Sequence, residues 1–228
     1  MIMKSDGFIR ITAAVFRKDT SSELRTRYAL NALFLFTLTT LSIILFSFQS
    51  ATVPVQVHAG LLWVLIFFAA MSGLSRTFIT EEDRGTILLL KLSTISTPVF
   101  YGKLLFNVLL LLALTAILTI LYSLVLPGFA VMSMTSFCIS LFLGTVGLAS
   151  ASTIIGALIA KANARGTLYP VLSFPIVLPL LLTVIRATTI AMEDPAWDAA
   201  MDEYRVLVSY IVAINAASYL VFEYIWKD

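Results

Sequence analysis

The chain has 228 residues, of which 60% are hydrophobic and only 12% are charged, and its formal net charge is +2. A soluble domain of this composition would have no polar surface, so the composition excludes that class and predicts an all-α, polytopic membrane protein. One cysteine and one histidine cannot make a disulfide framework, a redox pair or a zinc site, and Cys138 in an apolar run is expected to be buried.

The N-terminal segment, residues 6–27, is basic and amphipathic. Phe8, Ile11 and Val15 recur at helical spacing, with Arg10 among the other positions, which is typical of a helix lying on the membrane surface. Thr20–Glu23 has the spacing of a capping box and predicts that a second helix starts there. We therefore expect an elbow before the first span, and the alternative is a solvated charged tail.

Six apolar runs follow, each close to the ~17 to 25 residues that a membrane-spanning helix needs. The predicted spans are residues 28–48, 57–74, 104–126, 136–160, 168–185 and 206–225. Of the 15 Lys and Arg residues, 13 fall on one side of this six-span arrangement. The positive-inside rule then predicts that both termini are cytoplasmic, together with the loop 75–103.

Two of the runs have special composition. The fifth contains Pro170, Pro175 and Pro179, each of which removes a backbone donor, so we expect this helix to be kinked or broken near mid-membrane and to line a cavity or be buried in protein. The fourth has small residues at four-residue spacing, beginning with Gly147 and Ala151, which allow close helix packing.

The loop 186–205 between the last two runs is acidic. Asp194-Pro195 suits a helix start, and Trp197, Ala200, Met201 and Tyr204 then fall at helical spacing. We expect a short amphipathic helix on the outer surface, which serves as an interfacial anchor or, alternatively, as a lid or a partner dock.

The loop 75–103 is the longest water-compatible segment between two apolar runs. Thr80 followed by Asp83 can cap a helix, and Glu81 and Glu82 would complement the positive end of its dipole. Its apolar piece, residues 87–92, would rise only about 9 Å as a helix, against a hydrocarbon core of about 30 Å. We therefore expect these leucines to enter a groove on a cytosolic partner, and the alternative is a helix lying against the membrane.

The chain shows no chemistry of its own for driving transport. The only Asp, Glu, Lys, Arg or His residues of the six runs, His58 and Glu223, lie near the ends of their runs, so no proton relay is visible. Gly102-Lys103 is followed by Leu104 where a phosphate loop needs Ser or Thr. The chain is therefore not expected to be an enzyme, and energy must enter from outside the membrane.

Specific residues of the loop resemble a known family. Residues 81–86 with the leucines behind them, and Pro98 and Gly102-Lys103 before the third span, resemble the coupling-helix region of type-2 ABC exporter membrane subunits. With Phe78, Asn107 and the proline-rich stretch 172–179, the whole chain is similar to heme exporter protein B, the membrane subunit of the bacterial cytochrome c maturation ABC complex. The resemblance implies that the residues coupling the chain to its ATPase are Glu81, Glu82, Asp83, Gly85, Thr86, Leu88 and Leu89.

The resemblance also implies partners and a location. These are a separate cytosolic ABC ATPase that binds ATP, a heme-handling membrane subunit, a periplasmic heme chaperone, and a second copy of the chain, in the bacterial inner membrane. Heme is expected as a substrate and not as a bound cofactor, and no metal site or nucleic-acid partner is expected. His58, near the outer face, could ligate heme but is more simply an interfacial residue.

Two other functions fit the sequence. One is a type-2 exporter of lipid, polysaccharide or drug, and the other is a non-transporting scaffold for a heme-handling partner.

Overall fold

The computed structural model describes residues 2–26, 28–48, 53–74, 94–160 and 165–227, together with positions 78, 81, 85, 90 and 92. Within this part of the chain, seven helices form and no strand does. The helices are α1 (Ile2–Thr26), α2 (Tyr28–Ser47), α3 (Val55–Leu74), α6 (Ser96–Val125), α7 (Met134–Ala160), α8 (Arg165–Glu193) and α9 (Met201–Lys227).

Most of these helices are long and apolar enough to cross a membrane. Five qualify over their described residues, namely α3, α6, α7, α8 and α9, while the corresponding apolar part of α2 is shorter and covers Phe34–Ser47. The prediction of an all-helical, multi-pass membrane protein is confirmed at this level. The exposed large apolar side chains on the outer faces, such as Leu124 and Tyr224, suit contact with lipid.

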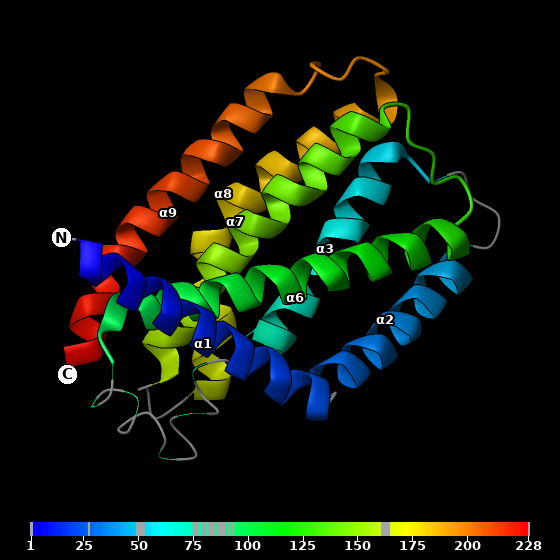
Figure 1. Ribbon diagram of the computed structural model, residues 1–228. Coiled ribbons are helices and arrows are strands. Elements are labelled where there is room, and N and C mark those ends of the chain that lie inside the picture. Colours follow the sequence, from blue (N-terminus) through cyan, green and yellow to red (C-terminus); the bar gives the residue numbers. More distant parts are fainter. Residues whose placement is uncertain are drawn as a thin grey trace.

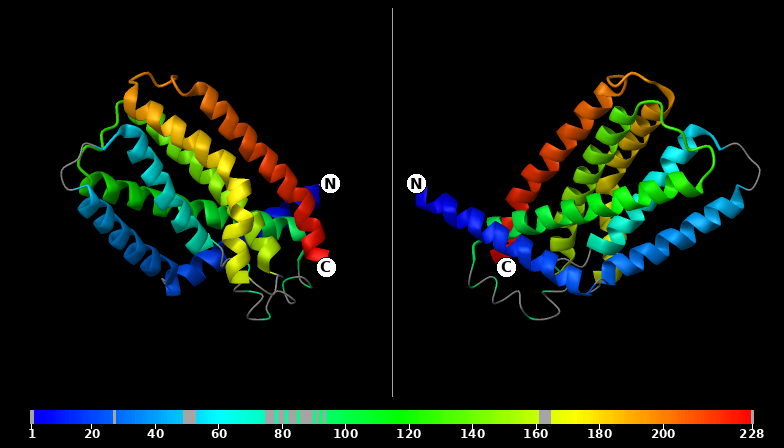
Figure 2. Two further views of the ribbon diagram at one scale, coloured as in Figure 1. Left: turned by 180° about the vertical axis from the view of Figure 1, so that it is seen from behind. Right: turned by 45° about the vertical axis from the view of Figure 1, so that its right-hand side comes forward.

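The helices pack around α7, which contacts α3, α6, α8 and α9 (Figure 2). In the most apolar stretch of α7, 67% of the residues are buried, against 17% for α9. Helix α1 crosses the start of α6, and α2 packs against α3 at the other edge of the bundle (Figure 1). The outer position of α9 leaves most of its surface free for lipid or for other subunits.

Glycines in α7 permit this central position. A Cβ atom at Gly144 would overlap the ring of Trp63 on α3, and one at Gly147 would come within 2.7 Å of Leu180 on α8. The approach also brings the Trp63 Nε1–H within 2.8 Å of Thr188 Oγ1 on α8. The predicted close packing through the small residues of this run is therefore confirmed at Gly147, while Gly144 and Trp63 add a contact that was not predicted.

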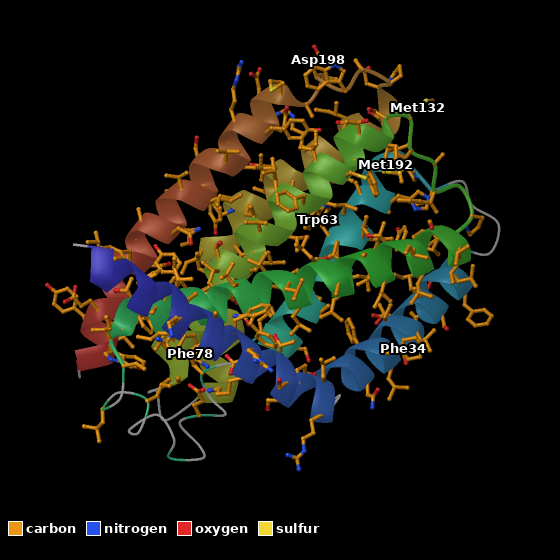
Figure 3. The ribbon with its side chains drawn as sticks, in the orientation of Figure 1. Phe34, Trp63, Phe78, Met132, Met192 and Asp198 are labelled. Atoms are coloured by element: carbon orange, nitrogen blue, oxygen red, sulfur yellow. The ribbon has the colours of Figure 1, made fainter. Side chains whose placement is uncertain are left out.

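The two ends of the bundle differ. Both chain termini lie at one end (Figure 1), together with Phe78, and Asp198 and Met132 lie at the other (Figure 3). The exposed Arg186 and Arg205, each paired with a carboxylate of α9, belong to the same end as Asp198.

Two predictions near the chain start and in α7 are wrong. Thr20 does not cap a new helix, because α1 continues through it and its hydroxyl donates to the carbonyl of Phe16 at 2.8 Å, four residues earlier. Cys138 is exposed on the outer face of α7 and not buried.

Three further boundaries differ from prediction. Helix α6 begins at Ser96, eight residues earlier than expected, so Gly102 and Lys103 are helical. No separate outer helix forms over 186–205, because α8 continues to Glu193 and α9 begins at Met201. The short link between them turns where the Asp194 carboxylate accepts a hydrogen bond from the Ala196 amide at 2.8 Å.

The proline-rich helix is continuous. Helix α8 includes Pro170, Pro175 and Pro179 and is helical throughout, so the predicted break is absent, although the ribbon changes direction along its length (Figure 2). Pro175 and Pro179 lie exposed on the surface of the chain and not inside it.

Candidate functional site: a buried ion cluster at the start of α6

The residues predicted to couple the chain to an ATPase are partly described. Glu81 is buried, and Gly85 is exposed in a turn with φ of +66°, a left-handed conformation that glycine adopts without strain. The remaining five predicted residues lie outside the described part of the chain: Glu82, Asp83, Thr86, Leu88 and Leu89.

Glu81 is held by Lys103, which the sequence placed in a water-compatible loop. In the structure Lys103 lies in the third turn of α6 and is 0% exposed. Its Nζ lies 3.0 Å from Glu81 Oε2 and 3.4 Å from Asp19 Oδ2 of α1. Lys18 of α1 completes the cluster, since its ammonium forms an ion pair with Glu81 and lies 3.3 Å from Asp19 Oδ1.

The cluster exists because α1 covers the start of α6. A Cβ atom at Gly102 would lie 2.8 Å from the backbone oxygen of Thr12 and 2.8 Å from Cβ of Val15, so only glycine allows this approach. The Thr12 hydroxyl also donates to the carbonyl of Pro98 at 3.3 Å. The neighbouring Lys103 is therefore shut off from water by α1 and needs the carboxylates beside it.

The charges in the cluster balance, with two ammonium groups facing two carboxylates. Burial alone would raise the pKa of Glu81, but the charge of Lys103 and the hydrogen bond from Lys18 outweigh it and lower that pKa. Burial alone would lower the pKa of Lys18, but its hydrogen bond to Glu81 and the nearby carboxylate charges raise it. Glu81 and Lys18 are therefore both charged at neutral pH, as members of a paired buried network.

An aromatic cluster adjoins the ions and extends to α9. The Phe78 ring lies 4.9 Å from Lys103 Nζ and 5.7 Å, centroid to centroid, from Phe222. Phe222 in turn contacts Phe100 and Trp226 at 5.0 and 5.6 Å. The start of the segment between α3 and α6 is thus attached to α9 as well as to α1 and α6.

Asn107 carries the connection to the centre of the bundle. It lies one turn after Lys103, is fully buried, and donates to Thr153 Oγ1 of α7 at 2.8 Å. Along α6, Gly102 therefore contacts α1, Lys103 pairs with Glu81, and Asn107 forms a hydrogen bond to α7. The sequence signal for the site is this set of a glycine, a lysine and an asparagine in a mostly apolar helix.

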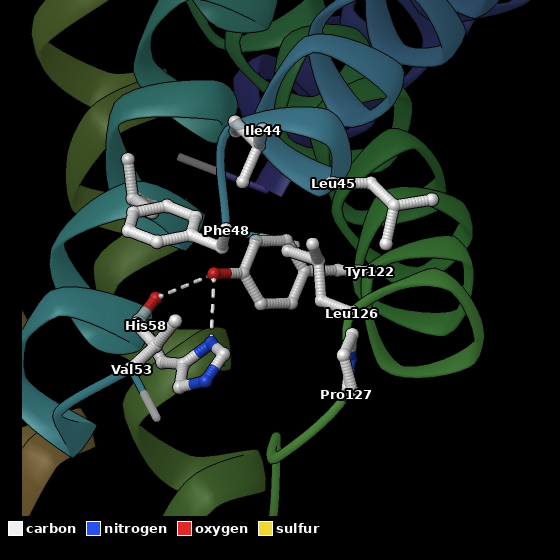
Figure 4. Close-up of a pocket in the computed structure, with 9 residues that line it drawn as sticks. Ile44, Leu45, Phe48, Val53, His58, Tyr122, Leu126 and Pro127 are labelled. Carbon is white, nitrogen blue, oxygen red and sulfur yellow. Dashed lines mark hydrogen bonds between the residues drawn. The ribbon is translucent and has the colours of Figure 1, made fainter. Parts of the chain in front are cut away.

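His58, near the start of α3, is buried among protein side chains, and its ring lies beside the Tyr122 hydroxyl (Figure 4). Its Nδ1 is 3.2 Å from the Tyr122 hydroxyl, which also donates to the His58 carbonyl at 3.3 Å. Its Nε2 has no hydrogen-bond partner among the described residues. The adjoining cavity of about 60 Å³ can hold a few waters and is far too small for heme.

The described residues of this site form ion pairs, hydrogen bonds and aromatic contacts between elements. Over the ranges given above, no group of three His, Cys, Asp or Glu residues could hold a metal ion. Through Glu81, Phe78 and Asn107, the Lys103 cluster connects the segment between α3 and α6 to four helices, namely α1, α6, α7 and α9.

Comparison with known proteins gives one family. The family model described as CcmB protein matches residues 10–225, which is nearly the whole chain. No curated protein is significantly similar to it.

Proposed function

Since the chain belongs to the CcmB protein family, and is therefore a membrane subunit of a heme exporter ABC complex of cytochrome c biogenesis, we propose how it works in that complex. ATP hydrolysis by a separate cytosolic subunit moves the segment between α3 and α6. The movement passes into the bundle and drives heme export or the release of a heme-loaded periplasmic chaperone. The chain itself hydrolyses nothing.

The proposal requires a cytoplasmic position for that segment. We propose six spans, with α2 as the first, so that both termini and the loop 75–103 face the cytoplasm. Two observations support this arrangement. Of the 15 basic residues, 13 belong to that side, and the termini and Phe78 lie at one end of the bundle.

The observation that carries the proposal is the burial of Lys103 with Glu81 and Asp19. A segment that only rested on the surface could move without affecting the spans. Breaking a buried ion pair costs about 3–5 kcal/mol, so a force on Glu81 is passed to α6 and α1 before the contact separates. Phe78 extends the same attachment to α9.

The ATPase contact itself is assigned to residues beyond this anchor. Leu92 is 80% exposed, although it is a large apolar side chain outside the spans, and it supports an apolar contact surface there. We assign Glu82, Asp83, Gly85, Thr86, Leu88 and Leu89 to the same contact on the family resemblance. A contact surface attached to a buried anchor is the arrangement that a lever needs.

The other proposed partners lie in and across the membrane. The little-buried α9 and the exposed Pro175 and Pro179 of α8 offer surfaces for a second copy of the chain or for the heme-handling membrane subunit. With Pro170, these residues form the bent helix that we propose to border the path or the moving interface. The periplasmic chaperone would meet the end of the bundle that carries Asp198.

A complementation experiment tests the proposal. Cells lacking the gene receive the wild-type chain, Lys103→Met, or the matched control Arg205→Met, which removes an exposed cation at the other end. Covalent heme is then stained in membrane and periplasmic fractions. We expect wild type and control to restore c-type cytochromes and Lys103→Met to fail although it is inserted.

The contrary outcomes are distinct. Unchanged cytochromes in the deletion strain would reject the assignment to heme export, and full activity of Lys103→Met would reject the anchor. Heme accumulation in reconstituted vesicles, dependent on ATP and the ATPase subunit, separates transport from chaperone release. Its absence, with ATP-dependent release intact, would favour a non-transporting role.

A further inference from the structure

We propose that the angle between α1 and α6 is a binding site for an anionic phospholipid. The site has two parts, an apolar groove between the helices and a basic hollow on the adjacent face of α1. Apart from Lys18 and Thr12, which border the two parts, their lining residues take no role in the coupling proposed above.

The apolar part begins where the two helices diverge from their contact at Gly102. It is a groove of about 600 Å³, within the ~300–1,000 Å³ range of pockets that hold small organic ligands. Phe8, Ile9 and Phe16 line it from α1, and Leu105 and Leu109 line it from α6. Ile9 is 64% exposed and Leu105 and Leu109 are each 51% exposed, so the groove offers apolar contact that the chain does not fill.

The basic part lies on the next face of α1. Arg10 and Arg17 stand two turns apart, about 10 Å along the helix, and the small Ala13 and Ala14 leave a shallow hollow between them. Both arginines are exposed, and within the described part of the chain neither forms an ion pair. Lys18, also at this hollow, is already bound to Glu81 and Asp19.

The two parts meet at Ala13, which lines both. A ligand that fits both must have an apolar chain and, beside it, an anionic group. Guanidinium groups bind phosphate oxygens in a forked geometry, and basic side chains at a membrane surface attract anionic lipid. A membrane helix of a partner would fill the groove but would leave Arg10 and Arg17 unmatched, so a phospholipid with a net negative charge fits better.

Native mass spectrometry of the purified full chain tests this site. The chain is incubated with equal amounts of phosphatidylglycerol and phosphatidylcholine. We expect wild type to retain phosphatidylglycerol selectively. Replacing both arginines, Arg10→Gln and Arg17→Gln, should lower that preference by about fivefold for each arginine, or about 25-fold together. Arg25→Gln, an exposed cation of the same helix outside the hollow, is the matched control and should leave it unchanged.

A second variant and a crosslinker test the groove separately. Ala13→Trp should displace the bound lipid although both arginines remain. A photoreactive residue at Leu109 should crosslink to lipid in native membranes. Equal retention of the two lipids by wild type, or an unchanged preference in the double variant, would overturn the proposal. A crosslink from Leu109 to a second copy or to another membrane protein would overturn it as well.

Discussion

Replacing Lys103 by Met leaves two nearly buried carboxylates facing one ammonium. The side chains of Glu81 and Asp19 are only 10% and 11% exposed, and the net charge of the cluster falls from zero to minus one. Removing one partner of a buried pair costs about 3–5 kcal/mol. Lys18 remains and is half exposed, which offsets part of the loss, so we expect about 3 kcal/mol.

Thermal unfolding of the purified protein in mild detergent measures this cost. For a chain of this size each kcal/mol corresponds to ~2–4 °C, so the Tm of Lys103→Met should fall by about 6–12 °C. Lys18→Met makes the same change in charge, but at a half-exposed group, and should cost about 1 kcal/mol or less.

A double variant separates charge from packing. Lys103→Met with Glu81→Gln restores a neutral cluster and should recover at least half of the lost Tm, since a buried pair replaced as a whole costs far less than a broken one. The reasoning would be refuted if Lys103→Met unfolded within about 2 °C of wild type. It would also be refuted if the double variant were no more stable than the single one.

Three other results are expected. Gly144→Ala should lower the Tm by forcing a Cβ into a filled contact, at about 1–3 kcal/mol, whereas Gly60→Ala, which meets open space, should not. Leu88→Asp with Leu89→Asp should lose the ATPase in co-purification without loss of membrane insertion, and a retained, active ATPase would contradict the contact. Because the pKa of Glu81 is lowered, its stabilisation is full above the ordinary value of 4.5 and is lost as pH falls through the lowered pKa, so the Tm difference between wild type and Glu81→Gln should vanish in acid.

The bundle follows from the sequence because long apolar runs have few alternatives in a membrane. The residues at which the helices begin and end do not follow from the sequence in the same way, because local capping patterns compete with packing between helices. The capping pattern at Thr20 is present, but α1 is held along α6 by Gly102 and Thr12 and continues past it. The pattern after Asp194 is also present, but its apolar residues are buried in the bundle, Ala200 just before α9 and Tyr204 within α9.

The site illustrates a second limit. A loop rich in charge at residues 75–103 predicts a contact with a partner, and composition alone suggests that every charge in it meets water. Lys103 and its partner Glu81 are buried instead, because a glycine next to Lys103 admits another helix over it. The pairing of Lys103 with Asp19, across 84 positions of sequence, depends on that crossing and cannot be derived from either segment alone.

The most direct test of the mechanism is crosslinking from the exposed Leu92 in native membranes. A photoreactive residue at that position should capture a nucleotide-hydrolysing subunit from the cytoplasmic side, and Lys103→Met should weaken ATP-driven heme delivery while that crosslink persists. Capture of no such subunit, or labelling of Leu92 only from the periplasm, would contradict a chain that is driven from the cytosol through this segment.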